Sequence, residues 1–521
     1  MLLFLQASTN ALYGVRDLLL IAPELILTVC ACVVLVMEVV LPARRVEWIA
    51  NFALLGLALA LVSLGTLWTL NAPLLPVSGF YHMVRVDGFA LFFKIIFLLG
   101  ALFTVAISPR YLAERGEGRG EFYALVLFAT VGMMMIAGGY DLLVLYISLE
   151  LMALSFYVLV AFTQRERKAN EAAMKYFLLG AFSSGVLLYG MSLLFGVAGS
   201  TNIGDIAPAV RAALAPLPVF DAPVALPAPP LRPLLLLGMV ALAAGLFFKI
   251  SAVPFHMWAP DAYEGAPTPV TAFLSTGSKA ASFALFLRIF VEALEGMRAD
   301  WAPLLGVVAA VTILVGNWAA VTQDNAKRLL AYSSISNAGY LLLGLIAGNN
   351  YGYLGLAIYL LVYTLMNIGA FGIVLSLRGR GEVGERVEDF AGLGRRAPFV
   401  ALLMSVFLLS LGGLPATGGF IGKYFLFGGL LSRGAAEGKS WYTWLALWAI
   451  LNTVVSFYYY IRFIRQMYLQ EDVGGETQPP ALGPTLVASL AVAGAGIIFI
   501  GVYPQPLINL ARVVVTSLGL A

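Results

Sequence analysis

Four ionisable side chains in this 521-residue sequence stand inside long apolar segments. Glu150 lies in DLLVLYISLELMALSFYVLV, Lys249 in LAAGLFFKISAVPF, Lys279 in TAFLSTGSKAASFALF and Lys423 in GGLPATGGFIGKYFLF. A charge at the centre of a bilayer costs about 2.5–3.5 kcal/mol on insertion scales. One acid and three amines at such positions predict a chain of titratable sites in a hydrated interior, because desolvation favours the neutral amine and permits proton exchange. A static ion pair between Glu150 and Lys249 is the alternative.

Two prolines strengthen the hypothesis of an ion site. Pro254 follows Lys249 by five residues, and Pro415 precedes Lys423 by eight. Proline interrupts a helix, and freed backbone groups are tolerated in a membrane only where protein or a water-filled cavity satisfies them. Paired helix breaks, each beside a buried lysine, are typical of ion sites in inverted-repeat transporters.

Other polar residues allow less specific interpretations. Lys175 lies about one turn into its apolar segment and either reaches the headgroups or marks an entry site. His256 lies near a helix end and is either a satisfied interfacial histidine or a relay member. Lys94 is expected to extend to the headgroups. Asp261 and Glu264 are expected to be solvated loop acids, with proton collection as the alternative.

The composition identifies the environment that must hold these residues. Hydrophobic residues make up 61% of the chain and charged residues 11%, where soluble domains carry about 25% charged residues. Mean hydropathy is +0.91. These values exclude a water-soluble enzyme and a disordered linker, and a net charge of +3 offers no basic field for nucleic acid. We predict a polytopic membrane protein.

Apolar windows of about 20 residues predict an all-α fold with about fourteen transmembrane helices. They are expected near 17–40, 47–71, 87–108, 121–138, 141–162, 172–198, 234–258, 269–293, 302–322, 327–347, 352–377, 398–432, 441–468 and 482–509. The helices at 234–258 and 398–432, the seventh and twelfth, are expected to be broken. The connection 200–232 is predicted to be an ordered external loop.

The broken helices divide the chain into parts. Helices 4–8 (121–293) and 9–13 (302–468) are expected to be inverted repeats, because an offset of five helices reverses direction. A three-helix segment (1–120) precedes them, and a last helix (482–521) follows.

The distribution of basic residues predicts the orientation in the membrane. Basic residues gather after odd-numbered spans: Arg44, Arg45, Arg110, Arg115, Arg119, Arg165, Arg167, Lys168, Lys327, Arg328, Arg378, Arg380, Arg386, Arg395, Arg396, Arg462 and Arg465. These loops should be cytoplasmic, with both termini outside.

Cysteine and histidine counts argue against a redox centre or metal site. Cys30 and Cys32 are the only cysteines, and residues two apart on a helix point about 200° apart. Iron–sulfur clusters need about four thiolates. A haem between His82 and His256 is the remaining alternative.

Several segments resemble one protein family. FFKISAVPFHMWAPDAYEGAPTPVTAFLSTGSKAASFALFLR, NAKRLLAYSSISNAGYLLLG and LSLGGLPATGGFIGKYFLF are similar to the antiporter-like membrane subunits of the proton-pumping NADH:quinone oxidoreductase, respiratory complex I. EAAMKYFLLGAFSSGVLLYG and APELILTVCACVVLV resemble its subunit N branch, the bacterial counterpart of mitochondrial subunit 2. The resemblance covers essentially the whole chain.

The resemblance implies a role for each buried charge. Glu150 and Lys249 would form an ion pair whose opening and closing modulates the lysine, Lys279 would relay protons, and Lys423 would face the exit. Protons would move from the cytoplasm outward, driven by quinone reduction elsewhere in the complex. Flavin, iron–sulfur clusters and quinone are expected on partner subunits, together with other antiporter-like subunits in the bacterial plasma membrane.

The sequence departs from the family in one place. Many relatives in the subunit L and M branches have histidine where this chain has Asn337, in the polar stretch 332–337. Asparagine cannot change charge, which puts a histidine relay there in doubt, although a bound water could substitute. The hydroxyls of this stretch either bond to their own helix or line a water path.

Other functions remain as alternatives. A sodium/proton antiporter subunit or a membrane-bound hydrogenase subunit would share the lysines, and a scaffold within the complex would not pump. A stand-alone solute transporter lacks support, because no segment resembles a substrate-recognition pattern.

Overall fold

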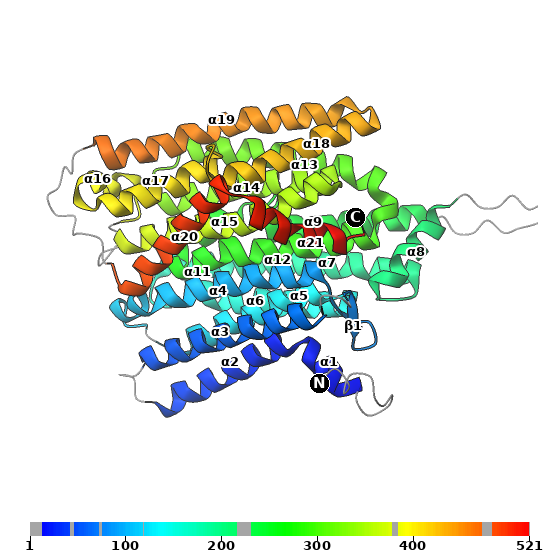
Figure 1. The fold of residues 1–521 in the computed structure, drawn as a ribbon, viewed down its shortest axis with the longest axis horizontal. Coiled ribbons are helices and arrows are strands. Elements are labelled where there is room, and N and C mark those ends of the chain that lie inside the picture. Colours follow the sequence, from blue (N-terminus) through cyan, green and yellow to red (C-terminus); the bar gives the residue numbers. More distant parts are fainter. Residues whose placement is uncertain are drawn as a thin grey trace, which may run out of the picture.

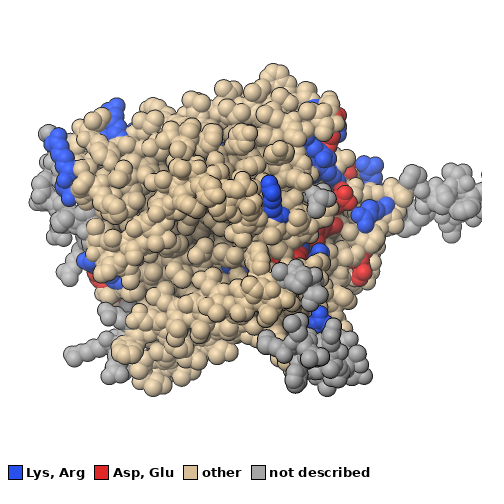
Figure 2. All heavy atoms as spheres, in the orientation of Figure 1, with Lys and Arg blue, Asp and Glu red and all other residues tan. Residues whose placement is uncertain are grey.

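Long parallel helices form almost the whole protein in the computed structural model. It describes residues 13–41, 46–71, 75–117, 119–215, 231–377, 384–470 and 482–519. Thirteen helices within these ranges are long and apolar enough to cross a membrane. They lie side by side along the longest axis of the molecule (Figure 1). In Figure 2, most Lys, Arg, Asp and Glu side chains lie toward the two ends of the molecule, and few lie on the face between them. The predicted all-α polytopic membrane fold is confirmed.

The amino-terminal part packs three long helices beside a small hairpin. Its elements are α1 (Tyr13–Leu20), α2 (Ala22–Val40), α3 (Val46–Asn71), the antiparallel strands β1 (Val77–Gly79) and β2 (Val84–Val86), and α4 (Gly88–Glu114). Asp87 caps α4, since its side chain accepts a hydrogen bond of 2.7 Å from the amide of Ala90.

The next part contains the first broken helix. Its elements are α5 (Glu121–Gly138), α6 (Leu142–Val160), α7 (Arg167–Ala198), α8 (Ile203–Leu214), α9 (Leu231–Ile250), α10 (Trp258–Gly265), α11 (Thr268–Phe273), the π-helix η4 (Leu274–Ser278), α12 (Lys279–Phe286), the π-helix η5 (Leu287–Ala293) and the 3₁₀-helix η6 (Glu295–Met297). The predicted break in the helix over 234–258 is confirmed, because α9 ends at Ile250 and Ser251 is left-handed, at φ 61°. Residues before a proline disfavour helical backbone, so the break precedes Pro254. Lys249 consequently lies in the last turn of a half-helix.

The following part contains the second broken helix. Its elements are α13 (Arg298–Val321), α14 (Ala326–Ala347), α15 (Asn350–Leu377), the 3₁₀-helix η7 (Val387–Phe390), α16 (Leu393–Arg396), α17 (Pro398–Gly412), α18 (Gly418–Glu437) and α19 (Ser440–Leu469). The predicted break at Pro415 is confirmed. Helix α17 ends at Gly412, Gly413 adopts φ 92°, which favours glycine, and α18 starts at Gly418.

Two helices complete the chain, where one had been predicted over 482–509. Helices α20 (Pro484–Val502) and α21 (Gln505–Ser517) are separated at Pro504, which cannot donate the backbone hydrogen bond of a continuing helix. The amino- and carboxy-terminal ends of the described chain lie at the same end of the molecule, near α8 and β1 (Figure 1).

Some sequence predictions fall outside the described residues. The predicted loop 200–232 contains α8 at its start, and its segment 216–230 is not described. Arg44, Arg45, Arg378 and Arg380 also lie outside the described ranges.

Candidate proton-relay site

Glu150 and Lys249 face the same interior region but do not touch. Lys249 on α9 is 3% exposed, and Glu150 on α6 is half-buried. Across the described residues no ion pair within 4 Å joins them, although the charge of Glu150 acts on Lys249. The amine of Lys249 has no hydrogen-bond partner and lies 5.9 Å from the ring centroids of both Tyr157 and Phe248. The static ion pair is therefore not formed in this structure.

Lys279 is held by direct hydrogen bonds. It is 1% exposed and starts α12 after the π-helical turn η4. Its amine donates to the backbone oxygen and the Oγ of Ser334, both at 2.5 Å. The hydroxyl of Tyr363 donates to the same Oγ at 2.7 Å, and the hydroxyl of Tyr263 lies 3.4 Å from it. Lys279 therefore contacts the polar stretch predicted on α14.

This stretch continues on the far side of α14. Ser333 Oγ and the hydroxyl of Tyr460 are 2.5 Å apart, and Asn337 Nδ2 donates to the backbone oxygen of Ser333 at 2.9 Å. Tyr359 donates to Asn337 Oδ1 at 2.6 Å. All four side chains are buried. The residue at the position of the family histidine is thus an amide fixed on both sides.

A second amide extends the polar groups toward Lys423. Tyr459 donates to Asn317 Oδ1 at 3.1 Å, and Asn317 Nδ2 donates to the hydroxyl of Tyr340 at 3.3 Å. The rings of Tyr459 and Tyr460 have centroids 4.4 Å apart. We call the polar side chains between Lys279 and Lys423 the polar row. Its members are Ser333, Ser334, Asn337, Tyr359, Tyr460, Tyr459, Asn317 and Tyr340.

Lys423 lies at the other end of the polar row. It is 3% exposed, and its amine is 4.6 Å from the ring centroid of Tyr340. The amine donates to the backbone oxygens of Leu411 at 2.8 Å and Gly412 at 3.2 Å, the last carbonyls of the half-helix α17. A cation is favoured there because the carboxy end of a helix carries partial negative charge.

Lys175 belongs to a charged cluster at one end of the molecule. It forms ion pairs of 2.8 Å with both Glu171 and Asp261, and Arg328 forms ion pairs of 2.9 Å with Asp261 and Glu264. Burial alone would raise the pKa of Asp261, but the hydrogen bonds from Lys175 and Arg328 outweigh it and hold that pKa below its usual value. A cavity of about 200 Å³ opens between these five side chains. The expectation that Asp261 and Glu264 are merely solvated is wrong.

His256 lies in the turn between α9 and α10 and is half-buried. Its Nδ1 atom has no hydrogen-bond partner, and burial lowers the pKa of the imidazole. Among the described contacts, no hydrogen bond connects it with Lys249. Its role as a relay member stays a prediction.

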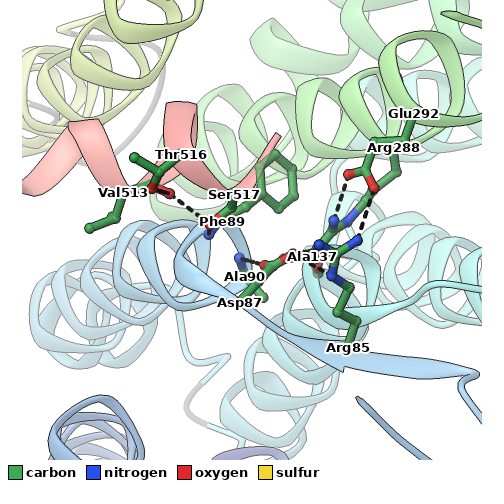
Figure 3. A network of polar contacts seen from close by, with 10 residues as sticks. All are labelled: Arg85, Asp87, Phe89, Ala90, Ala137, Arg288, Glu292, Val513, Thr516 and Ser517. Carbon is green, nitrogen blue, oxygen red and sulfur yellow. Dashed lines mark hydrogen bonds and ion pairs between the residues drawn. The ribbon is translucent and has the colours of Figure 1, made fainter. Parts of the chain in front are cut away.

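A second set of charges, which the sequence did not indicate, lies where η5 meets the start of α4. Arg288 on η5 is fully buried and pairs with Asp87 at 2.9 Å and with Glu292 at 2.6 Å. Arg85 bonds both acids at 3.3 Å, and Arg288 also donates to the backbone oxygen of Ala137 (Figure 3). Two cations face two acids, which is the compensation that buried charges require.

The prediction that Lys94 extends to the headgroups is wrong. Its side chain is 0% exposed, and its amine lies 2.6 Å from Glu24 Oε1, which is itself 3% exposed. The partner comes from α2, two helices earlier, so no spacing along the chain indicated the pair. Glu24 could have been found as an acid inside an apolar segment.

The tyrosines and Asn317 of the polar row were also missed. Asn317 stands in an apolar segment, and an amide there needs partners, which was the available signal. Tyrosines give a weaker signal, because their rings are at home in an apolar core.

In the described ranges no group of three or more His, Cys, Asp or Glu side chains could hold a metal ion. Cys30 is buried and Cys32 is exposed.

Comparison with known proteins identifies the family. Residues 139–448 match the profile of the NADH:quinone oxidoreductase/Mrp antiporter transmembrane family. NADH-quinone oxidoreductase subunit N 2 of Solibacter usitatus is 46% identical over 96% of this chain and 98% of its own. A chain of respiratory complex I from Thermus thermophilus, solved with bound aureothin, is 35% identical, with a TM-score of 0.75 over 94% of this chain and 99% of its own.

A more distant structure shares the fold alone. A chain of the Mrp complex from Dietzia sp. is 20% identical, with a TM-score of 0.81 over 96% of this chain and 97% of its own. The identity to the subunit N relatives is higher and extends over nearly the full length. The chain therefore belongs to the subunit N family of NADH-quinone oxidoreductase.

Proposed function

We propose that this chain is the proton-translocating, antiporter-like membrane subunit N of an NADH:quinone oxidoreductase, respiratory complex I. Glu150, Lys249, Lys279 and Lys423 carry the protons. The observation that supports this most directly is the polar row, because Lys279 bonds Ser334 at one end and Lys423 lies against Tyr340 at the other. Polar side chains inside the membrane are costly, and where they occur they mark ion and proton pathways.

The proton enters at the charged cluster around Lys175 and Asp261. It reaches Lys249, passes to Lys279, crosses along the polar row and leaves from Lys423. Two contacts support this order. Lys279 and Lys423 touch the polar row, whereas the amine of Lys249 lies near the ring of Tyr157, which contacts Tyr176 beside Lys175.

The Glu150–Lys249 pair works as the switch, and this structure corresponds to its open form. With the carboxylate more than 4 Å away, the amine of Lys249 has no hydrogen-bond partner among the described residues. Closing the pair would give this amine a carboxylate partner. His256, in the adjoining turn, is a possible further member of the entry path.

The helix packing supports the two inverted repeats, 121–293 and 302–468. In the first, α5 packs extensively on α6 and α7 on α9; in the second, the corresponding pairs α13 with α14 and α15 with α18 do the same. Each repeat contains one interrupted helix with a buried lysine. The segments 1–120 and 482–521 flank them.

The partners and location follow from this assignment. The chain works beside other antiporter-like and peripheral subunits, which carry the flavin, the iron–sulfur clusters and the quinone site. It lies in the bacterial plasma membrane with both termini outside. A sodium/proton antiporter or hydrogenase subunit has less support, because the relatives at 46% and 44% identity are named as subunit N.

Substitution of Lys249 tests the function. In the assembled complex, Lys249→Ala should abolish turnover coupled to pumping, because the switch loses its amine. Lys439→Ala, which removes an exposed amine, is the matched control. Proton uptake per NADH oxidised is measured in membrane vesicles. Near-normal coupled turnover of Lys249→Ala would refute the relay, and a change in assembly without a change in proton stoichiometry would indicate a scaffold.

A further inference from the structure

A layer of aromatic side chains lies next to the charged cluster, on its inner side. The rings of Tyr176 on α7 and Trp258 on α10 stack with centroids 4.5 Å apart and an interplanar angle of 21°. Tyr157 contacts Tyr176 edge-on at 4.8 Å, and Phe248 contacts Trp258 at 5.3 Å. Tyr176 and Trp258 are 2% and 3% exposed. The layer is therefore closed to solvent.

The layer reaches Lys249 on its other side. The two rings nearest the amine of Lys249 are Tyr157 and Phe248, each with its centroid 5.9 Å away. These same rings contact Tyr176 and Trp258. A continuous set of ring contacts thus connects the stack beside the entry cavity with the amine that the proton must reach.

The stack is tied to both neighbouring sites. Tyr176 directly follows Lys175, and Trp258 lies one helical turn before Asp261, so the segments that form the 2.8 Å ion pair also form the stack. Trp258 Nε1 donates to the backbone oxygen of Phe248 at 2.9 Å, in the last turn of α9 beside Lys249. Movement of α10 against α7 would alter the ion pair, the stack and the end of α9 together.

The backbones behind the stack are in close contact. A methyl group at Gly265 on α10 would lie 2.5 Å from Cβ of Ala172 on α7. Stacked ring faces offer a proton no hydrogen-bond partner, and among the described residues neither the hydroxyl of Tyr157 nor the amine of Lys249 has one, so no chain of hydrogen bonds crosses the layer to Lys249. The closed stack therefore separates the entry cavity from Lys249.

We propose that the stacked rings of Tyr176 and Trp258 form a barrier to protons on the path from the entry cavity to Lys249. The Lys175–Asp261 ion pair holds this barrier shut. The proposal rests on the proposed function, since a barrier has a purpose only if protons travel to Lys249. Parting of the two rings admits a proton, and their closure behind it prevents its return to the cytoplasm.

The experiment measures proton leak in the assembled complex reconstituted into liposomes. A pH gradient is imposed without NADH, and its decay is followed; protons moved per NADH oxidised are then measured in the same preparation. Tyr176→Ala and Trp258→Ala should speed the decay several-fold and lower the ratio, because each leaves a gap in the layer. Tyr176→Phe and Trp258→Phe keep a ring and should restore both readings to near the wild-type values.

The controls separate this proposal from the proposed function. Trp318→Ala removes a ring that is 73% exposed on α13 and should leave the leak unchanged. Assembled Tyr176→Ala complex with wild-type leak and wild-type ratio would overturn the barrier, even where Lys249→Ala still abolishes coupled turnover. Normal coupled turnover in Lys249→Ala would instead overturn the relay itself. If Trp258→Ala fails to assemble, Tyr176→Ala and the two phenylalanine variants decide the question.

Discussion

Removal of one member of the Glu24–Lys94 pair should weaken the protein far more than removal of both. The carboxylate and the amine are 2.6 Å apart and are 3% and 0% exposed, and neither has another hydrogen-bond partner within the described residues. Lys94→Met therefore leaves a buried carboxylate without compensation. Breaking a buried pair in this way costs about 3–5 kcal/mol.

The double variant provides the decisive comparison. Glu24→Leu with Lys94→Met removes both charges and leaves no buried polar group, and replacement of a buried pair by hydrophobic residues is often without cost or stabilising by about 1–4 kcal/mol. Since about 1.4 kcal/mol corresponds to a factor of ten, the single variant should shift the unfolding equilibrium by about a hundredfold to several thousandfold, and the double variant should recover most of it.

Pulse proteolysis of the solubilised complex measures this difference. The fraction of subunit cleaved during a short exposure to protease is compared for the wild type, each single variant and the double variant. A Lys94→Met complex as resistant as the wild type would refute the reasoning and would return Lys94 to the headgroup region. A double variant as weak as the single variants would show that shape, and not charge, determines the cost.

Two further predictions test the helix break and the charged cluster. A methyl group at Gly419 would overlap the backbone oxygen of Ser410 and lie 2.8 Å from its carbonyl carbon. Gly419→Ala should therefore destabilise the protein by about 1–3 kcal/mol and lower coupled turnover, because it moves Lys423 off the end of α17. The control Gly428→Ala, where a methyl group would meet nothing within 4 Å, should change neither the rate of thermal inactivation nor the turnover. The pKa of Asp261 is lowered in the folded protein, so its stabilising ion pairs are complete above about pH 4 and are lost as the pH falls through the lowered pKa. The stability difference between the wild type and Asp261→Asn should consequently be constant at neutral pH and close only in acid, as measured by thermal melting at a series of pH values; a difference that grew in acid would contradict the assigned ion pairs.

The sequence was sufficient for the membrane fold, the family, the three buried lysines and the half-buried Glu150, because each rests on a local signal. A run of apolar residues, a proline within it or a lysine among phenylalanines is visible along the chain. Contacts between distant helices leave no such signal. Three contacts depend on which faces of distant helices pack together. They are the pairing of Lys94 with Glu24, the bonds from Lys279 to Ser334 and the stack of Tyr176 on Trp258. For the same reason, the end of α9 at Ile250 could be placed only within several residues of Pro254.

The two asparagines of the polar row have a consequence for the idle enzyme. A hydroxyl can both donate and accept a hydrogen bond through one oxygen, so it can reorient after each proton transfer. A carboxamide donates only through its nitrogen and accepts only through its oxygen. Tyr359 and Tyr459 end on the oxygens of Asn337 and Asn317, where the amide cannot hand a charge onward. A proton on the proposed path along the polar row can therefore pass Asn337 and Asn317 only when these hydrogen bonds rearrange or a water molecule takes part. In the proposed mechanism, these two amides block the return of protons along the polar row while the enzyme is at rest.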